Sequence, residues 1–174
     1  MTPPPDAGST LRQSFAVRVS RLEDRWHCEL LAADADDELP VLERALGEPG
    51  TADWPGPFVV VVDSRLYFVV LRHGPGGMVR ALVSDATFQE WVLAAEAVER
   101  YGIEVAGGST VDDAFDDDEQ GWPGGDLDVL ADAGLSAEEL SRLLEADDLW
   151  ADEMVLRIAQ RLGFDDELSA AVAP

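Results

Sequence analysis

The chain has 174 residues, and its 36 Asp and Glu against 12 Arg give a formal net charge of -24. This length makes one domain or at most two small ones. The acidic charge excludes a nucleic acid or a membrane held through a basic patch, and a single Cys excludes an internal disulfide or a multi-Cys metal site. No apolar run reaches the roughly 18 residues of a membrane span. The first residues lack the basic and apolar stretches of a signal peptide, so we expect a cytoplasmic protein.

Residues 13–103 show the patterns of a sheet, interrupted by a helix. Residues 15–19 alternate apolar and polar side chains, and 25–31 follow after a turn, which predicts a pair of strands. Residues 39–46 place their apolar side chains on one helical face, and Gly47 ends that helix.

A hairpin and a further strand come next. The β-branched run at 58–62 predicts a strand that is buried on both faces. Residues 63–65 are expected to form the turn, and 66–71 the returning strand. Residues 78–83 continue the meander after a glycine-rich turn.

A helix is predicted over residues 85–101, with Ser84 as its N-cap and Gly102 as its left-handed terminator. Its expected buried stripe consists of Phe88, Trp91, Val92, Ala95 and Val98. The element order ββαβββα predicts an α+β fold, with an N-terminal, mostly antiparallel sheet and helices packed on it.

Three short helices are predicted for residues 126–168. Asp126 is the expected cap of the first helix, over 127–133, and Ser136 with Glu139 predicts a capping box at the second. Helices this short bury little apolar surface, so we expect this unit to depend on the first unit or on a partner.

The last of these helices is expected over residues 149–162. Its apolar side consists of Trp150, Met154, Ile158 and Leu162. Gly163 followed by Phe164 matches a Schellman ending. Residues 169–174 are expected to form a tail.

The negative charge is concentrated in the second half of the chain. Residues 104–174 hold 20 acids and 3 Arg, a net charge of -17, against -7 for residues 1–103. Glycine and mutually repelling acids in 104–125 predict a flexible linker between two units, and the Pro-rich residues 1–12 are expected to be disordered. Linker acids and loop tryptophans are the candidate partner-binding residues: Trp54, Asp112, Asp113, Asp116, Asp117, Asp118, Glu119 and Trp122.

One short motif points to metal chemistry. His27-Cys28-Glu29 matches the H-x-E of zinc-dependent nucleobase deaminases, but those enzymes need two further Cys, which this chain lacks. On a strand, His27 and Glu29 share one face while Cys28 points to the other. Residues 116–121 resemble half of a calcium loop, yet Leu127 stands where a bidentate Glu is required. We therefore expect no metal, cofactor or catalytic residue.

Five motifs occur together and in order: residues 15–19 (FAVRV), 79–86 (VRALVSDA), 125–132 (GDLDVLAD), 135–140 (LSAEEL) and 161–168 (RLGFDDEL). With an acidic linker in the middle, this set resembles the tRNA adenosine deaminase-associated proteins of high-GC Gram-positive bacteria, over about residues 13–168. That family takes its name from a gene position beside a tRNA adenosine deaminase, and it has no established catalytic residues to transfer. The resemblance implies an association with the deaminase, physical or regulatory.

The leading hypothesis is a non-enzymatic accessory protein that binds or modulates a tRNA adenosine deaminase. An enzyme that holds tRNA presents a basic surface, which is complementary to a chain this acidic. The alternative is a nucleic-acid mimic or general interaction protein for another basic protein. A third hypothesis is an unrecognised enzyme, which the shortage of nucleophiles and bases other than carboxylates disfavours.

Overall fold

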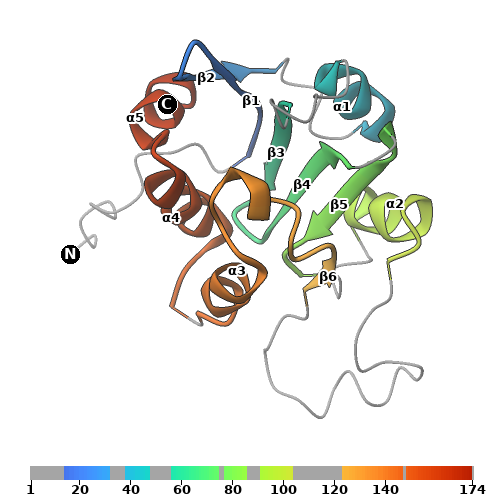
Figure 1. The fold of residues 1–174 in the computed structure, drawn as a ribbon. Coiled ribbons are helices and arrows are strands. Elements are labelled where there is room, and N and C mark those ends of the chain that lie inside the picture. Colours follow the sequence, from blue (N-terminus) through green and yellow to red (C-terminus); the bar gives the residue numbers. More distant parts are fainter. Residues whose placement is uncertain are drawn as a thin grey trace, which may run out of the picture.

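The structure is a computed structural model that describes residues 14–31, 38–47, 56–74, 77–85, 91–103, 123–146 and 148–173. Within these ranges the strands form one six-stranded antiparallel sheet in the order β2-β1-β3-β4-β5-β6 (Figure 1). The strands are β1 (Phe15–Leu22), β2 (Arg25–Leu30), β3 (Phe58–Asp63), β4 (Tyr67–His73), β5 (Val79–Val83) and β6 (Gly124–Gly125).

The central strands β3 and β4 are apolar on both faces. Val60 and Val62 face one hydrophobic cluster, whereas Val59 and Val61 face a second cluster on the opposite side of the sheet. Successive side chains of a strand point to opposite faces, so a continuous valine run requires a cover on each face. This confirms the prediction that the strand at 58–62 is buried on both sides.

Helices supply that cover on both faces (Figure 1). α1 (Leu39–Leu46) and α2 (Val92–Arg100) pack on one face, and α3 (Ala137–Leu144), α4 (Ala151–Leu162) and α5 (Asp165–Ala171) pack on the other. The mixed α+β fold with an N-terminal sheet and C-terminal helices is confirmed. None of the helices in the described ranges is long and apolar enough to cross a bilayer.

The C-terminal helices share a core with the N-terminal sheet. Phe164, which follows α4, lies 5.8 Å from Phe58 of β3 and 5.3 Å from Trp26 of β2, measured between ring centroids. Leu168 of α5 and Val172 belong to the same cluster. The C-terminal helices therefore bury their apolar side chains against β1, β2 and β3.

The segment expected to be a linker, 104–125, ends inside the sheet. Gly124 and Gly125 form β6 and pair with Val83 and Leu82 of β5. Residues 104–122 lie outside the described residues, as does the Pro-rich start at 1–12. Helix α5 was not among the predicted elements, and it includes residues 169–171 of the expected tail.

Several local signals in the sequence are confirmed. Ser136 and Glu139 form the capping box at α3, with each side chain bound to the other residue's backbone N–H. The N–H of Phe164 donates to the carbonyl oxygen of Ala159 over 2.9 Å, and Gly163 has φ 97°, which is the predicted Schellman ending. Gly47 and Gly102 also take positive φ at the ends of their helices.

The predicted helix over 85–101 is wrong at its start. The Ser84 hydroxyl accepts the backbone N–H of Phe68 over 2.8 Å and so extends the β4–β5 pairing rather than capping a helix. Asp85 is not helical, residues 86–90 lie outside the described residues, and α2 begins at Val92. Of the expected stripe, Trp91 and Val98 pack, partly buried, against the core, whereas Val92 is 66% exposed. The fully buried side chains of α2 are Leu93, Ala94 and Ala97.

Two C-terminal predictions are wrong as well. Residues 127–133 form turns and one 3-10 turn at Ala131–Ala133, because the Asp126 carboxylate binds Arg80 instead of capping a helix. In α4 the expected apolar side is wrong at Trp150 only, because Ile158 is buried and Met154 and Leu162 pack, partly buried, against the same cluster. Trp150, expected in the core, stands at the N-cap and is 51% exposed.

We expect Gly125→Ala to destabilise the protein more than Gly102→Ala. Both glycines have positive φ, 98° and 59°, which costs an L-residue about 1–2 kcal/mol. At Gly125 an added Cβ would also lie 2.2 Å from the backbone oxygen of Ala81, whereas at Gly102 it meets nothing within 4 Å. Urea unfolding followed by circular dichroism measures both variants. Equal losses of unfolding free energy would show that β6 is not held tightly against β5.

Candidate functional site

The candidate residues chosen from the sequence lie outside the described residues. This holds for Trp54, Asp112, Asp113, Asp116, Asp117, Asp118, Glu119 and Trp122. The structure therefore neither brings them together nor separates them. The described residues that flank the acidic segment are Ile103 and Pro123, and both line the same pocket.

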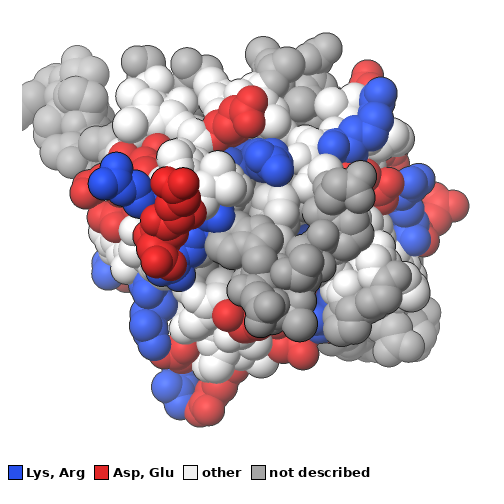
Figure 2. Space-filling model, turned by 45° about the horizontal axis from the view of Figure 1, so that its top comes forward, with Lys and Arg blue, Asp and Glu red and all other residues white. Residues whose placement is uncertain are grey.

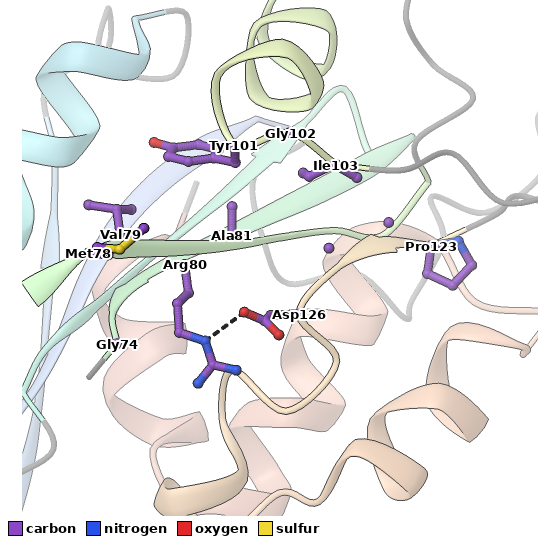
Figure 3. A pocket seen from close by; sticks show the side chains of 12 residues that line it. Gly74, Met78, Val79, Arg80, Ala81, Tyr101, Gly102, Ile103, Pro123 and Asp126 are labelled. Carbon is purple, nitrogen blue, oxygen red and sulfur yellow. Dashed lines mark hydrogen bonds and ion pairs between the residues drawn. The ribbon is translucent and has the colours of Figure 1, made fainter. Parts of the chain in front are cut away.

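That pocket has a volume of about 630 Å³ and lies where β5, β6 and the end of α2 meet (Figure 3). Its walls are mostly apolar side chains and glycine backbone, with Met78 75% exposed at the rim. Figure 3 shows Tyr101 and Arg80 on opposite sides of β5. The Tyr101 hydroxyl donates to a Glu43 carboxylate oxygen over 2.6 Å. Arg80 and Asp126, which also line the pocket, form an ion pair with each other.

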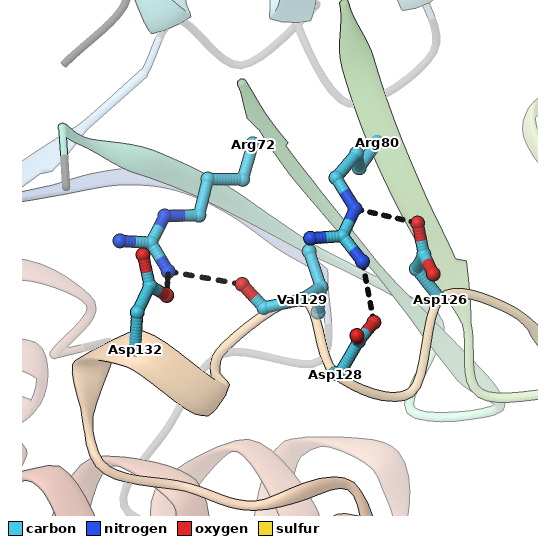
Figure 4. Close-up of polar contacts among 6 residues, drawn as sticks. All are labelled: Arg72, Arg80, Asp126, Asp128, Val129 and Asp132. Atoms are coloured by element: carbon cyan, nitrogen blue, oxygen red, sulfur yellow. Dashed lines mark hydrogen bonds and ion pairs between the residues drawn. The ribbon is translucent and has the colours of Figure 1, made fainter. Parts of the chain in front are cut away.

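Beside the pocket, two arginines hold the segment that follows β6 (Figure 4). Arg72 of β4 and Arg80 of β5 are cross-strand partners. Arg80 Nε donates to Asp126 Oδ2 over 2.6 Å, and a terminal nitrogen of Arg80 binds Asp128. Arg72, which is only 3% exposed, donates to the Val129 carbonyl oxygen over 2.9 Å and also binds Asp132. We call this set of residues the arginine clamp: Arg72, Arg80, Asp126, Asp128, Val129 and Asp132.

The carboxylates of the clamp offset the unfavourable burial and mutual repulsion of two arginine charges on adjacent strands. Burial lowers the pKa of Arg72, and the charge and hydrogen bond of Asp132 act against that shift. The hydrogen bond that Arg80 donates to Asp126 raises the pKa of Arg80 and lowers the pKa of Asp126. Two guanidinium groups on adjacent strands repel each other unless acids neutralise them. The acids of the 125–132 motif are therefore structural ion-pair partners.

The His27-Cys28-Glu29 motif has the geometry expected of a strand. In β2 the side chains of His27 and Glu29 are exposed, and Cys28 faces the core. Burial, followed by the charge of Glu167, raises the pKa of Cys28 to about 12. The thiol is therefore protonated at neutral pH, which makes it a poor nucleophile and metal ligand. Among the described residues no three His, Cys, Asp or Glu side chains form a metal-sized group.

An antiparallel sheet covered by helices on both faces, with a net negative charge and paired arginines, defines the class as an acidic α+β protein. Residues 14–165 match the family described as Rv3753c-like tRNA adenosine deaminase-associated protein, and the chain belongs to that family. It is 36% identical to Protein Rv3753c of Mycobacterium tuberculosis (strain ATCC 25618 / H37Rv) over 160 residues. The aligned region covers 91% of this chain and 87% of that protein. No solved structure matches the chain.

The arginine clamp was not predicted from the sequence. Asp126 was expected to cap a helix, and Arg72 and Arg80 were assigned no role. The pairs join residues 46 to 60 positions apart, so no local spacing reveals them. The signal available was weaker: two arginines within apolar strands, and a later motif with three aspartates on one turn-rich stretch.

We expect Asp126→Asn to reduce stability at neutral pH and to matter less in acid. The pKa of Asp126 is lowered in the folded state, so its contribution is present above the ordinary carboxyl pKa near 4 and is lost as the pH falls through the lowered pKa. Solvent screening of this partly exposed pair limits the loss to about 0.5–1 kcal/mol. Urea unfolding at pH 7 and pH 3 measures it, with Glu145→Gln as the control at an exposed acid outside the clamp. A pH-independent difference would contradict the ion-pair assignment.

We also expect protein purified without chelator to hold well under one zinc per chain. The buried thiol of Cys28 and the exposed, opposite-facing His27 do not converge on one point. Elemental analysis by mass spectrometry measures the content. One zinc per chain that disappears in His27→Ala would contradict this expectation.

Proposed function

We propose that the protein is a non-enzymatic, acidic accessory protein that associates with a tRNA adenosine deaminase in the cytoplasm. The family description supports an associated role. A deaminase that holds tRNA needs a basic surface for the phosphate backbone. A chain with a net charge of -24 complements such a surface.

The observation that carries the proposal is the pairing of the arginines within the chain. Ion pairs to carboxylates engage Arg21, Arg65, Arg72, Arg80, Arg100, Arg142 and Arg161. Acidic and basic side chains lie side by side on the face shown in Figure 2. Seven of the eleven described arginines are thus neutralised within the chain, and the net excess of acids is left for the solvent or a partner.

Part of this excess lies on the C-terminal helices. Several acids there form no ion pair with any described arginine: Glu145, Asp148, Asp165, Asp166 and Glu167. None of them is buried. Attraction between exposed charges of opposite sign speeds association and is screened over about 8 Å at physiological salt. Binding to the deaminase is therefore expected to be fast and sensitive to salt.

The test is a titration of the purified tRNA adenosine deaminase of the same organism with the full-length chain at about 50 mM and about 500 mM salt. We expect affinity to fall at least tenfold between these conditions, mainly through a slower association rate. A variant with Asn at 112, 113 and 116–118 and Gln at 119 should bind more weakly at low salt.

A matched control removes the same number of negative charges elsewhere. It carries Gln or Asn at six exposed acids of residues 14–103: Glu23, Asp24, Glu29, Glu38, Glu96 and Glu99. Equal weakening by both variants would show that only net charge matters, which favours a general mimic for basic proteins. Absence of binding by the unmodified chain at low salt would refute the association.

A further inference from the structure

An exposed tryptophan stands on the surface formed by the C-terminal helices and the β3–β4 turn. Trp150 is 51% exposed at the N-cap of α4. Its backbone N–H donates to a carboxylate oxygen of Glu153 over 2.8 Å, which closes the first turn of the helix. Tryptophan is the residue type most enriched among the side chains that dominate binding energy at protein interfaces.

The indole ring is held in place by the turn between β3 and β4. The Arg65 guanidinium carbon lies 5.2 Å from the Trp150 ring centroid. Arg65 Nε donates over 2.9 Å to Asp152, which is 1% exposed, and the Arg65 carbonyl oxygen accepts the N–H of Ala151 over 3.0 Å. Ser64 and Arg65 both have positive φ, 52° and 61°, so the turn is tight. A ring fixed in this way loses little side-chain entropy when a partner binds it.

The charges around the ring are mostly negative. Asp148 is exposed and lies two residues before Trp150, and a carboxylate oxygen of Glu153 accepts the Trp150 backbone N–H. The positive charge of Arg65 is matched by the buried carboxylate of Asp152. We name Arg65, Asp148, Trp150 and Glu153 the Trp150 surface. An aromatic ring flanked by carboxylates attracts a cationic side chain through both its π face and its surroundings.

We propose that the Trp150 surface is a docking site for a basic polypeptide segment of the partner, with an Arg or Lys side chain placed against the indole. This rests on the proposed function and assigns the contact to the N-terminus of α4. Charge complementarity selects the occupant: the phosphates of a nucleic acid would be repelled by Asp148 and Glu153. The indole supplies the part of the affinity that salt does not remove.

The test measures the binding of purified tRNA adenosine deaminase to full-length variants by biolayer interferometry. Trp150→Ala is expected to weaken binding by about tenfold or more, mainly through faster dissociation. Asp148→Lys leaves the ring and the core in place, and it is expected to weaken binding several-fold through local repulsion. Thermal unfolding by circular dichroism checks that both variants are folded.

Two matched controls lie on α2, which packs on the opposite face of the sheet from α4. Val92→Ala removes an exposed apolar side chain, and Glu96→Lys makes the same charge change as Asp148→Lys at an exposed acid. Both controls should bind within about twofold of the unmodified chain. If Trp150→Ala or Asp148→Lys binds as tightly as its control, the docking site is refuted while the association stands. If the unmodified chain does not bind at all, both proposals fail.

Discussion

Burial of the central strands on both faces is the constraint on which the whole arrangement depends. β3 and β4 carry apolar side chains on each side, so the sheet cannot leave a face in water. α1 and α2 cover one face, and the only described helices on the other face come from residues 137–171. The acidic C-terminal half is therefore part of the fold of the N-terminal half, and the aromatic contacts of Phe164 with Trp26 and Phe58 join them.

The acids of the chain divide into two groups with different roles. Asp126, Asp128 and Asp132 neutralise a pair of arginines on adjacent strands, and Asp152 neutralises Arg65. These carboxylates are already used by the fold. The acids before α4 and at the start of α5 are not buried, and among the described residues they form no ion pair with an arginine. The number of acids in the sequence is therefore larger than the number of carboxylates that are free to meet a partner. In the same way, the number of arginines is larger than the number of free positive charges.

Sequence patterns predicted the elements whose causes are local. The capping box at Ser136 and the Schellman ending at Gly163 depend on neighbouring residues, and both are present. The predictions for Ser84 and Trp150 were wrong because tertiary contacts decide where these side chains lie. The Phe68 backbone N–H donates to the Ser84 hydroxyl, and Arg65 stacks on the Trp150 indole outside the core. The arginine clamp could not be predicted, since its pairs are distant in the chain. The predicted partner-binding residues fall outside the described residues and stay predictions.

The shared core also fixes an order of events during synthesis. The strands β1 to β5 leave the ribosome long before Phe164, Leu168 and Val172, which complete the cover of one sheet face. Strands that pair before this cover is made would expose a valine-rich face to water, and exposed apolar strands favour association between chains. Repulsion between copies that already carry an excess of acids opposes this association. We expect this repulsion to reduce association during the interval in which the fold is incomplete.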